Sequence, residues 1–326
     1  MSFSSRWPLW ILFAGAIVII LTMPVFFSGY ILFVLSTVGI YTIVTLGLNV
    51  LVGTTGQLSI GHAAFFAIGA YTATLLMLKL NLPYLLAIVV SAFFSGFCGL
   101  LVGIPATKLS GPYLGIATLG FGMLVQQVLR EWEVVTGGRN GLSVPSIWVG
   151  PYELSTDGSK YYLIVAITVL SIWLIRDLLR SPLGLAWRAL KDTEVAAQAV
   201  GIKVSWYKAL AFGVSAFFAG LAGALYAPFI GYINYESFGL MMSISFLSAV
   251  ILGGLGSITG SVLGAAYLAL APEIFRGLEQ MQMIAYGLVM TLVILVMPKG
   301  LMEIPSLFKR IRSNSGWLST NMLKRR

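Results

Sequence analysis

The chain is poor in charge, cysteine and histidine, and each scarcity excludes a class of function. Only 10% of its 326 residues are charged, against about 25% in a soluble globular protein. Because 58% are hydrophobic, the chain cannot cover a water-facing surface of normal size. One Cys and one His cannot form a metal-ligand cluster. Cys98 lies in an apolar run, where it is interpreted as a small packing residue.

Motifs for nucleotide binding and catalysis are also absent. The sequence has no Gly-Lys dipeptide, so its glycine-rich GGLGSITG stretch cannot complete a phosphate-binding P-loop. No nucleophile with a neighbouring base is evident. We therefore expect no enzyme activity and no cofactor bound by this chain. The net charge of +9 is not arranged as a basic stripe among exposed aromatics, which argues against nucleic acid as a partner.

Long apolar runs are abundant instead. A helix needs roughly 20 apolar residues to cross a bilayer, and lipid offers no partner for unpaired backbone groups, so we expect the runs to be helical. The sequence predicts an all-α, polytopic transmembrane bundle of about 8–10 spans, some of them broken or re-entrant. The runs lie near 8–27, 31–52, 60–78, 82–104, 112–130, 161–179, 209–230, 240–253, 257–271 and 281–297.

The basic residues predict that both termini are cytoplasmic. In that orientation 15 of the 20 Lys and Arg residues face the cytoplasm and 5 face outside, in agreement with the positive-inside rule. One long helix over 240–271 would place the basic tail outside, whereas two segments broken at GGLGSITG keep it inside. We favour the break. Residues 1–300 then form one transmembrane domain, and 301–326 form a basic cytoplasmic tail.

Two glycine-rich windows with similar spacing lie between apolar runs. A repeated pair of interrupted hydrophobic segments indicates a solute path at mid-membrane, although close helix packing is an alternative. The helix-break glycines are Gly53, Gly56, Gly61, Gly253, Gly256 and Gly260. Uncharged polar side chains near the first window and in a later run are candidates to line the path. They are Asn49, Gln57, Ser59, His62, Gln126 and Gln127.

The interiors of the spans hold essentially no Asp, Glu, Lys or Arg. An ion-coupled carrier usually needs such a residue to bind its coupling ion. His62 could relay a proton, but without an evident carboxylate partner it also fits a hydrogen-bonded packing residue. The functions that remain are transport with energy supplied by another protein, and a membrane scaffold.

The longest internal cytoplasmic segment, 181–208, contains a short amphipathic helix. Ser181-Pro182 ends the preceding helix or opens a new one, and Gly201 ends the amphipathic helix as a C-cap. A helix of this kind either docks into a groove of another protein or lies on anionic lipid. The residues alone leave both interpretations open. Its apolar side consists of Trp187, Ala189, Leu190, Val195, Ala196, Ala199 and Val200.

Five stretches within 41–266 resemble, in order, the inner-membrane permeases of branched-chain amino-acid ABC importers, and among them the M-type subunit. They are GLNVLVGTTGQLSIGHAAFFAIGAYTATLL, GPYLGIATLGFG, TGGRNGL, SPLGLAWRALKDTEVAAQAVGI and AVILGGLGSITGSVLGA. The resemblance implies a subunit of the bacterial inner membrane that forms a path for leucine, isoleucine and valine. It implies a second, H-type permease subunit, two cytoplasmic ATPase subunits that bind ATP, and an extracytoplasmic substrate-binding protein.

The resemblance also assigns roles to two segments. The family's E-A-A-x-x-x-G coupling pattern, which docks into the ATPase, is met here at Ala196, Ala197 and Gly201. Its Glu position holds Val195, with Glu194 one residue earlier, and Ala189 begins the segment.

The loop 131–160 is expected outside, where TGGRNGL would contact the binding protein through Gly138, Arg139 and Asn140; a structural turn is the alternative. A permease for urea or short amides, an ion-coupled secondary carrier and a non-transporting scaffold are the rival functions.

Overall fold

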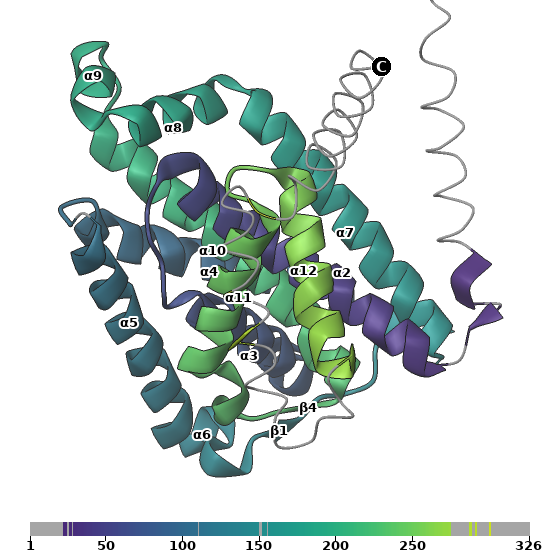
Figure 1. Ribbon diagram of the computed structural model, residues 1–326. Helices are drawn as coiled ribbons and strands as arrows, with labels where there is room; N and C mark the ends of the chain where they lie inside the picture. The colour runs from purple at the N-terminus through teal and green to yellow at the C-terminus, as the bar shows by residue number, and fades with distance from the viewer. Residues whose placement is uncertain are drawn as a thin grey trace, which may run out of the picture.

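The computed structural model of the chain is described for residues 22–24, 26–27, 29–109, 111–149, 152–154, 156–274, 287–288, 291 and 300. Most of the predicted runs at 8–27 and 281–297 lie outside the described residues, as do both termini and the basic tail. The described part is almost entirely helical (Figure 1).

Long apolar helices account for the bundle, as the sequence predicted. Within the described residues, seven helical segments are long and apolar enough to cross a membrane; the last of them, Tyr235–Gly253, includes a 3₁₀ turn before α11. Helix α12 is a shorter apolar helix of 17 residues. Each lies within a few residues of a predicted run. The helices are α2 (Gly29–Asn49), α3 (His62–Leu80), α4 (Tyr84–Ala106), α5 (Pro112–Glu131), α7 (Asp157–Arg180), α10 (Val204–Ile230), α11 (Leu240–Gly253) and α12 (Ile258–Ile274).

The centre of the bundle is α10, which packs mainly on α4, α3 and α2. Small residues make this packing close. A Cβ atom on Gly69 of α3 would lie 2.1 Å from the carbonyl oxygen of Gly220 in α10, so the two backbones touch at that crossing. Lipid gives little hydrophobic drive for helices to associate, and close backbone approach supplies van der Waals contact instead.

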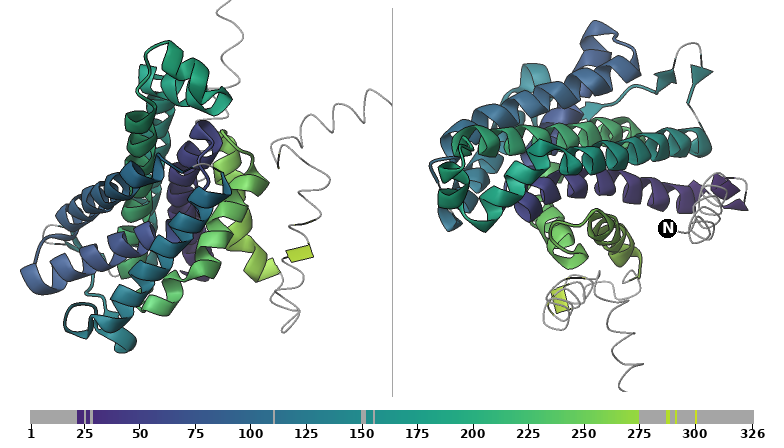
Figure 2. Two further views of the ribbon diagram at one scale, coloured as in Figure 1. Left: turned by 90° about the vertical axis from the view of Figure 1, so that its left-hand side faces the viewer. Right: turned by 90° about the horizontal axis from the view of Figure 1, so that it is seen from above.

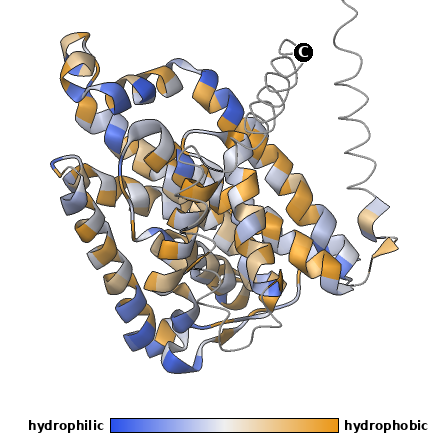
Figure 3. Cartoon of the chain, viewed as in Figure 1, coloured by the Kyte–Doolittle hydropathy of each residue, from blue (hydrophilic) through white to orange (hydrophobic). Residues whose placement is uncertain are grey.

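Short elements cover the two ends of the bundle, where hydrophilic residues gather (Figure 3). One end, called here the loop end, carries α6 (Glu133–Thr136), the 3₁₀ turns η3 (Gly138–Asn140) and η4 (Tyr235–Phe238), and strand β1 (Leu142–Ser143) paired antiparallel with β4 (Tyr232–Ile233). A second small hairpin joins β2 (Trp148–Val149) and β3 (Tyr152–Glu153). The opposite end, called here the α8 end, carries α8 (Pro182–Asp192) and α9 (Glu194–Ala199), which project beyond the spans (Figures 1 and 2).

The region 240–271 is broken, as predicted. Helices α11 and α12 form an antiparallel hairpin in which Gly253 lies against Gly260 and Ala249 lies against Gly264. The turn between the two helices contains Gly254 and Gly256, with φ angles of 122° and 79°. Such angles favour glycine, because a Cβ atom would clash with the backbone.

Candidate functional site

The two glycine windows predicted from the sequence touch each other. Beyond α2 the chain makes a π-helical turn, η2 (Val50–Thr54), and then leaves helical structure until His62. A Cβ atom on Gly53 would lie 2.3 Å from the backbone nitrogen of Gly256. Neither window could carry a side chain there without a shift of the other. We call this contact, residues 49–61 and 253–261, the double break.

Asn49 joins the two halves of the double break. Its Nδ2 donates to the Ser257 carbonyl at 2.9 Å, to Ser261 Oγ at 2.8 Å and more weakly to the Gly254 carbonyl at 3.3 Å. Its Oδ1 accepts from the Gly256 nitrogen at 2.7 Å. With 4% of its surface exposed, the amide has its donors and its acceptor satisfied inside the protein.

Three contacts attach α8 and α9 to the bundle beside the double break. Lys191 Nζ donates to the Gly53 carbonyl at 2.7 Å. Lys208 Nζ lies 2.5 Å from Glu194 Oε1, with side-chain exposures of 5% and 51%. In addition, the buried Trp187 donates from Nε1 to the Tyr207 carbonyl at 2.9 Å. Glu194 thus has an internal partner, and the Lys191 contact reaches directly to the glycine window.

The prediction of a single amphipathic helix over 189–201 is wrong, because the structure has two helices in this segment. Thr193 is extended, with φ −158° and ψ 120°, and separates α8 from α9. Gly201, directly after the C-cap residue Val200, has φ 87°, as expected of a glycine that ends a helix. Because the break rotates α9 relative to α8, the predicted apolar side is divided. Trp187, Leu190 and Ala197 are buried, Ala189 is half-buried, and Val195, Ala196, Ala199 and Val200 are exposed.

Most side chains on the outward surface of α9 are therefore apolar, with Glu194 and Gln198 exposed among them. Val195 and Val200 are 81% and 76% exposed, and no described residue covers them. An exposed apolar surface beside charged residues at the end of a bundle is typical of a contact with another protein. Ala197, in contrast, faces the bundle with 2% exposure.

His62 lies in a buried polar cluster behind the double break. Ser215 donates its hydroxyl hydrogen to the Gly47 carbonyl at 2.7 Å, and His62 Nε2 lies 3.3 Å from the same hydroxyl oxygen. His62 Nε2 is accordingly the donor in that contact, and Nδ1 has no hydrogen-bond partner among the described residues. Gln57 and Ser59 are buried next to it along the chain. Gln57 Nε2 contacts Thr55 Oγ1 at 3.0 Å.

The predicted path residues form two separate groups. Asn49, Gln57, Ser59 and His62 belong to the double break and its surroundings, and each is at most 4% exposed. Gln126 and Gln127 lie on α5 toward the loop end, where their partners are the Tyr235 carbonyl at 3.5 Å and Glu131 Oε1 at 3.1 Å.

The TGGRNGL loop is tightly turned at the loop end. Gly137, Gly138 and Gly141 have φ angles of 72°, 54° and 63°. Arg139 and Asn140 are exposed, and the Asn140 carbonyl accepts a hydrogen bond from the Tyr232 hydroxyl at 2.7 Å. The turn thus presents two polar side chains on a backbone fixed by its glycines. Among the described residues, no group of three or more His, Cys, Asp or Glu could hold a metal ion.

Comparisons with known proteins match the sequence of this chain to one family. The family model described as branched-chain amino acid transport system / permease component matches residues 30–298. The chain is 37% identical over 287 residues to the high-affinity branched-chain amino acid transport system permease protein LivM of Salmonella typhimurium, and equally to that of Escherichia coli. Each alignment covers 81% of this chain and 68% of LivM. No solved structure matches significantly.

More distant relatives include the permease protein LivH of Salmonella typhimurium, 25% identical over 295 residues, which cover 82% of this chain and 93% of LivH. The higher identity to LivM confirms the resemblance to the M-type subunit. The chain belongs to the permease components of branched-chain amino acid transport systems, and it is a multi-pass membrane protein.

Proposed function

We propose that this chain is one of two permease subunits in an ABC importer for leucine, isoleucine and valine in the bacterial inner membrane. Its relatives LivM and LivH are named as permeases of branched-chain amino acid transport, and an importer of this kind combines two such subunits. Two cytoplasmic ATPase subunits bind the ATP, and a binding protein outside the membrane delivers the substrate. The α8 end is then cytoplasmic, and the loop end, with Arg139 and Asn140, faces the binding protein.

The observation that carries the proposal is the combination of an exposed apolar surface on α9 with an internal link to the double break. Val195 and Val200 form an exposed apolar surface that the ATPase subunits can contact. Lys191, one turn before α9, donates a hydrogen bond to the Gly53 carbonyl. Movement of α8 and α9 by the ATPase pair is thereby delivered to the π-helical turn at the end of α2.

Asn49 would transmit that movement to the hairpin of α11 and α12. Three of its hydrogen bonds join the end of α2 to the turn over 254–257, and the fourth joins it to Ser261 of α12, so that these parts would move together. Glycines with positive φ and a π-helical turn are places where a backbone changes direction readily. The double break therefore serves as the hinge of an alternating-access cycle.

The polar, uncharged character of the double break suits the proposed substrate. A branched-chain amino acid combines an apolar side chain with a zwitterionic head, and a charge-free path passes it without binding it tightly. Asn49, Gln57, Ser59 and His62 are buried in the structure, so their contact with the substrate requires the double break to open. Gln126 and Gln127 are proposed contacts nearer the loop end.

Reconstitution tests the proposal. The complete complex of both permeases, the ATPase subunits and the binding protein is placed in liposomes with radiolabelled leucine, and we expect uptake only when ATP is present. Uptake driven by an ion gradient without the ATPase subunits would establish a secondary carrier instead. Uptake of urea in place of leucine would refute the assigned substrate class.

A matched pair of variants tests the docking surface. Val195→Asp places a charge on the exposed surface of α9, and we expect the ATPase subunits to be lost during purification. Val134→Asp changes an equally exposed valine of α6, at the opposite end of the bundle, and should retain them. Normal ATPase retention in Val195→Asp would contradict docking through α9.

A further inference from the structure

The corner between α7 and α8 carries three arginines and two apolar side chains on its surface. Trp173 and Leu185 are 55% and 60% exposed, and Arg176, Arg180 and Arg188 are exposed as well. Hydrophilic residues gather where the two helices meet (Figure 3). These five residues are called here the arginine corner. The proposed contact with the ATPase uses the surface of α9, so the arginine corner has no role in it.

The backbone under the arginine corner is tightly packed. A Cβ atom on Gly184 would lie 2.4 Å from the Leu179 carbonyl oxygen, so the first turn of α8 packs directly on the last turn of α7. The Arg188 side chain reaches back and donates from Nη2 to the same carbonyl at 3.3 Å. Its guanidinium therefore lies at the last turn of α7, which also carries Arg180.

The three arginines have no acidic partner. Arg176 and Arg180 are one helical turn apart, where two like charges repel. Within the described residues, no carboxylate lies within ion-pair distance of any of the three guanidinium groups. The stretch 173–192 holds four basic and two acidic residues, Asp177 and Asp192, which leaves a net charge of +2. An anion placed between the arginines would remove the repulsion.

The arginine corner lies at the level of the membrane surface. Helix α7 has 24 residues and is about 36 Å long at 1.5 Å per residue, enough to cross a hydrocarbon core of about 30 Å. Its exposed side is apolar at Val169, Leu170 and Trp173 and becomes charged at Arg176. A Trp followed by basic residues is typical of the boundary between hydrocarbon and headgroups. The arginines are therefore at the depth of lipid phosphates.

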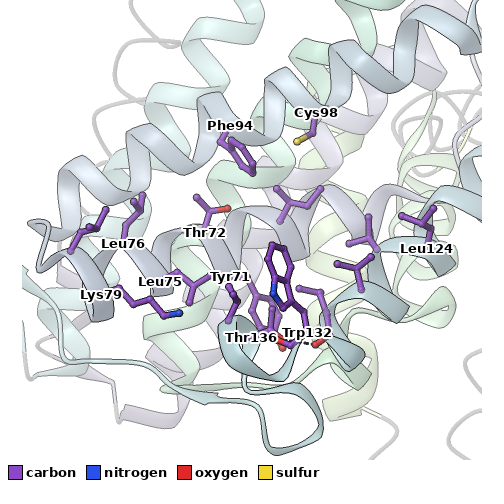
Figure 4. A pocket seen from close by; sticks show the side chains of 16 residues that line it. Tyr71, Thr72, Leu75, Leu76, Lys79, Phe94, Cys98, Leu124, Trp132 and Thr136 are labelled. Atoms are coloured by element: carbon purple, nitrogen blue, oxygen red, sulfur yellow. Dashed lines mark hydrogen bonds between the residues drawn. The ribbon is translucent and has the colours of Figure 1, made fainter.

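A larger hollow elsewhere on the bundle has a different character. The groove lined by α3, α4 and α5 is almost entirely hydrocarbon (Figure 4). Among its described lining residues only Lys79 is charged, and its ammonium already donates to the Val134 carbonyl at 3.2 Å. That groove offers an anion one cation that has a partner, whereas the arginine corner offers three guanidinium groups.

We propose that the arginine corner binds the phosphate of an anionic phospholipid in the leaflet at the α8 end. Arg176 and Arg180 hold the phosphate oxygens, because a planar guanidinium can donate two parallel hydrogen bonds to a phosphate. Trp173 and Leu185 contact the glycerol and the upper part of the acyl chains. A zwitterionic lipid balances its phosphate with its own cation, so the net positive charge of the corner favours an anionic lipid.

The proposal assigns different partners to α8 and α9. The sequence of this segment is compatible with docking on a protein and with contact to anionic lipid, and the extended Thr193 separates the two surfaces. Lipid holds the base of α8 at the membrane surface, while Val195 and Val200 of α9 stay available to another protein. The lipid site needs only that α7 spans the membrane, and it does not depend on the partners of the importer.

Photolabelling of the intact transporter tests the site. The complex is reconstituted in phosphatidylcholine nanodiscs with a small fraction of phosphatidylglycerol that carries a diazirine near the ester end of one acyl chain. We expect labels to concentrate on 173–188. Arg176→Gln combined with Arg180→Gln should lower this labelling at least fivefold, since each basic residue near an anionic surface strengthens binding by a factor of about five.

A control with the same loss of charge is Lys108→Gln combined with Lys203→Gln, two exposed residues at the α8 end, which should leave the labelling unchanged. Asp177→Asn should raise the labelling at least twofold, a direction that damage to the fold would not produce. Equal labelling by a phosphatidylcholine probe, or an equal fall in both double variants, would overturn the proposal. So would an absence of label from 173–188 in the intact complex, because another subunit would then cover the arginine corner.

Discussion

Replacement of Lys191 by methionine separates docking of the ATPase from its mechanical effect. The ammonium group donates to the Gly53 carbonyl at 2.7 Å, and methionine keeps most of the apolar stem while removing that donor. Hydrogen bonds to charged groups contribute about 1.5–3 kcal/mol. Lys191 is exposed on α8, and screening by water reduces this to about 1 kcal/mol, which corresponds to a factor of about five.

The measurement is the number of leucine molecules imported per ATP hydrolysed by the reconstituted complex. In Lys191→Met we expect this ratio to fall about fivefold, while the ATPase subunits stay bound and continue to hydrolyse ATP. The docking surface on α9 is intact in this variant, but its movement no longer reaches Gly53.

Lys203→Met is the matched control. Lys203 belongs to the same segment, is exposed, and its ammonium has no hydrogen bond within the described part of the chain. Its replacement should leave the ratio of import to hydrolysis unchanged. An unchanged ratio in Lys191→Met, or an equal fall in both variants, would refute the role assigned to the contact with Gly53.

Other variants test the double break, the ion pair and the loop. Gly53→Ala places a methyl group 2.3 Å from the opposite backbone and should lower the free energy of unfolding by about 1–3 kcal/mol. Thermal unfolding of the complex measures this, and Gly120→Ala, where a Cβ atom meets nothing within 4 Å, should not be destabilised. Glu194→Gln strands the buried ammonium of Lys208 and should lower the melting temperature more than Lys208→Met, which removes that charge; the reverse order would contradict the pairing. Arg139→Ala should weaken the stimulation of ATP hydrolysis by a limiting concentration of the binding protein, without changing basal ATP hydrolysis. Unaltered stimulation would show the loop to be only a turn.

The spans and their interruptions could be predicted because they depend on local composition. A run of apolar residues must be helical in lipid, and glycines that interrupt such a run leave a visible gap. The prediction that GGLGSITG divides 240–271 rested on this gap and on the placement of the basic tail, and the division is present. The contact between Gly53 and Gly256 depends on how α2 and α12 pack. The similar spacing of the two windows in the sequence indicated only that they are alike.

The errors and omissions arise where tertiary contacts decide. The single helix over 189–201 was inferred from continuous helical periodicity, but Thr193 is extended and the apolar side is divided between the core and the surface. The partners of Asn49 and Lys191 are 212 and 138 residues away along the chain. A lone sequence identifies such residues as polar or basic but gives no signal of what they bind.

The distribution of contacts around the double break fits a hinge that is moved by a modest force. Asn49 Nδ2 is within reach of three acceptors, at 2.8, 2.9 and 3.3 Å. Its two hydrogens can therefore change partners without leaving the amide unpaired. A hydrogen bond of this kind contributes about 1 kcal/mol net, whereas breaking a buried ion pair costs about 3–5 kcal/mol.

Charged contacts lie outside the double break. Lys191 is exposed, so water can replace its contact with Gly53 as it breaks, whereas Lys208 is buried and keeps Glu194, which is half-exposed, as its partner. If a carboxylate replaced the amide at Asn49, it would face the Ser257 carbonyl in a site that is 4% exposed. Asn49→Asp should therefore either hold the double break in one conformation or unfold it, and in both cases it should abolish uptake. Under the proposed function, the ATPase then works against exchangeable hydrogen bonds at the double break, whose residues include no Asp, Glu, Lys or Arg.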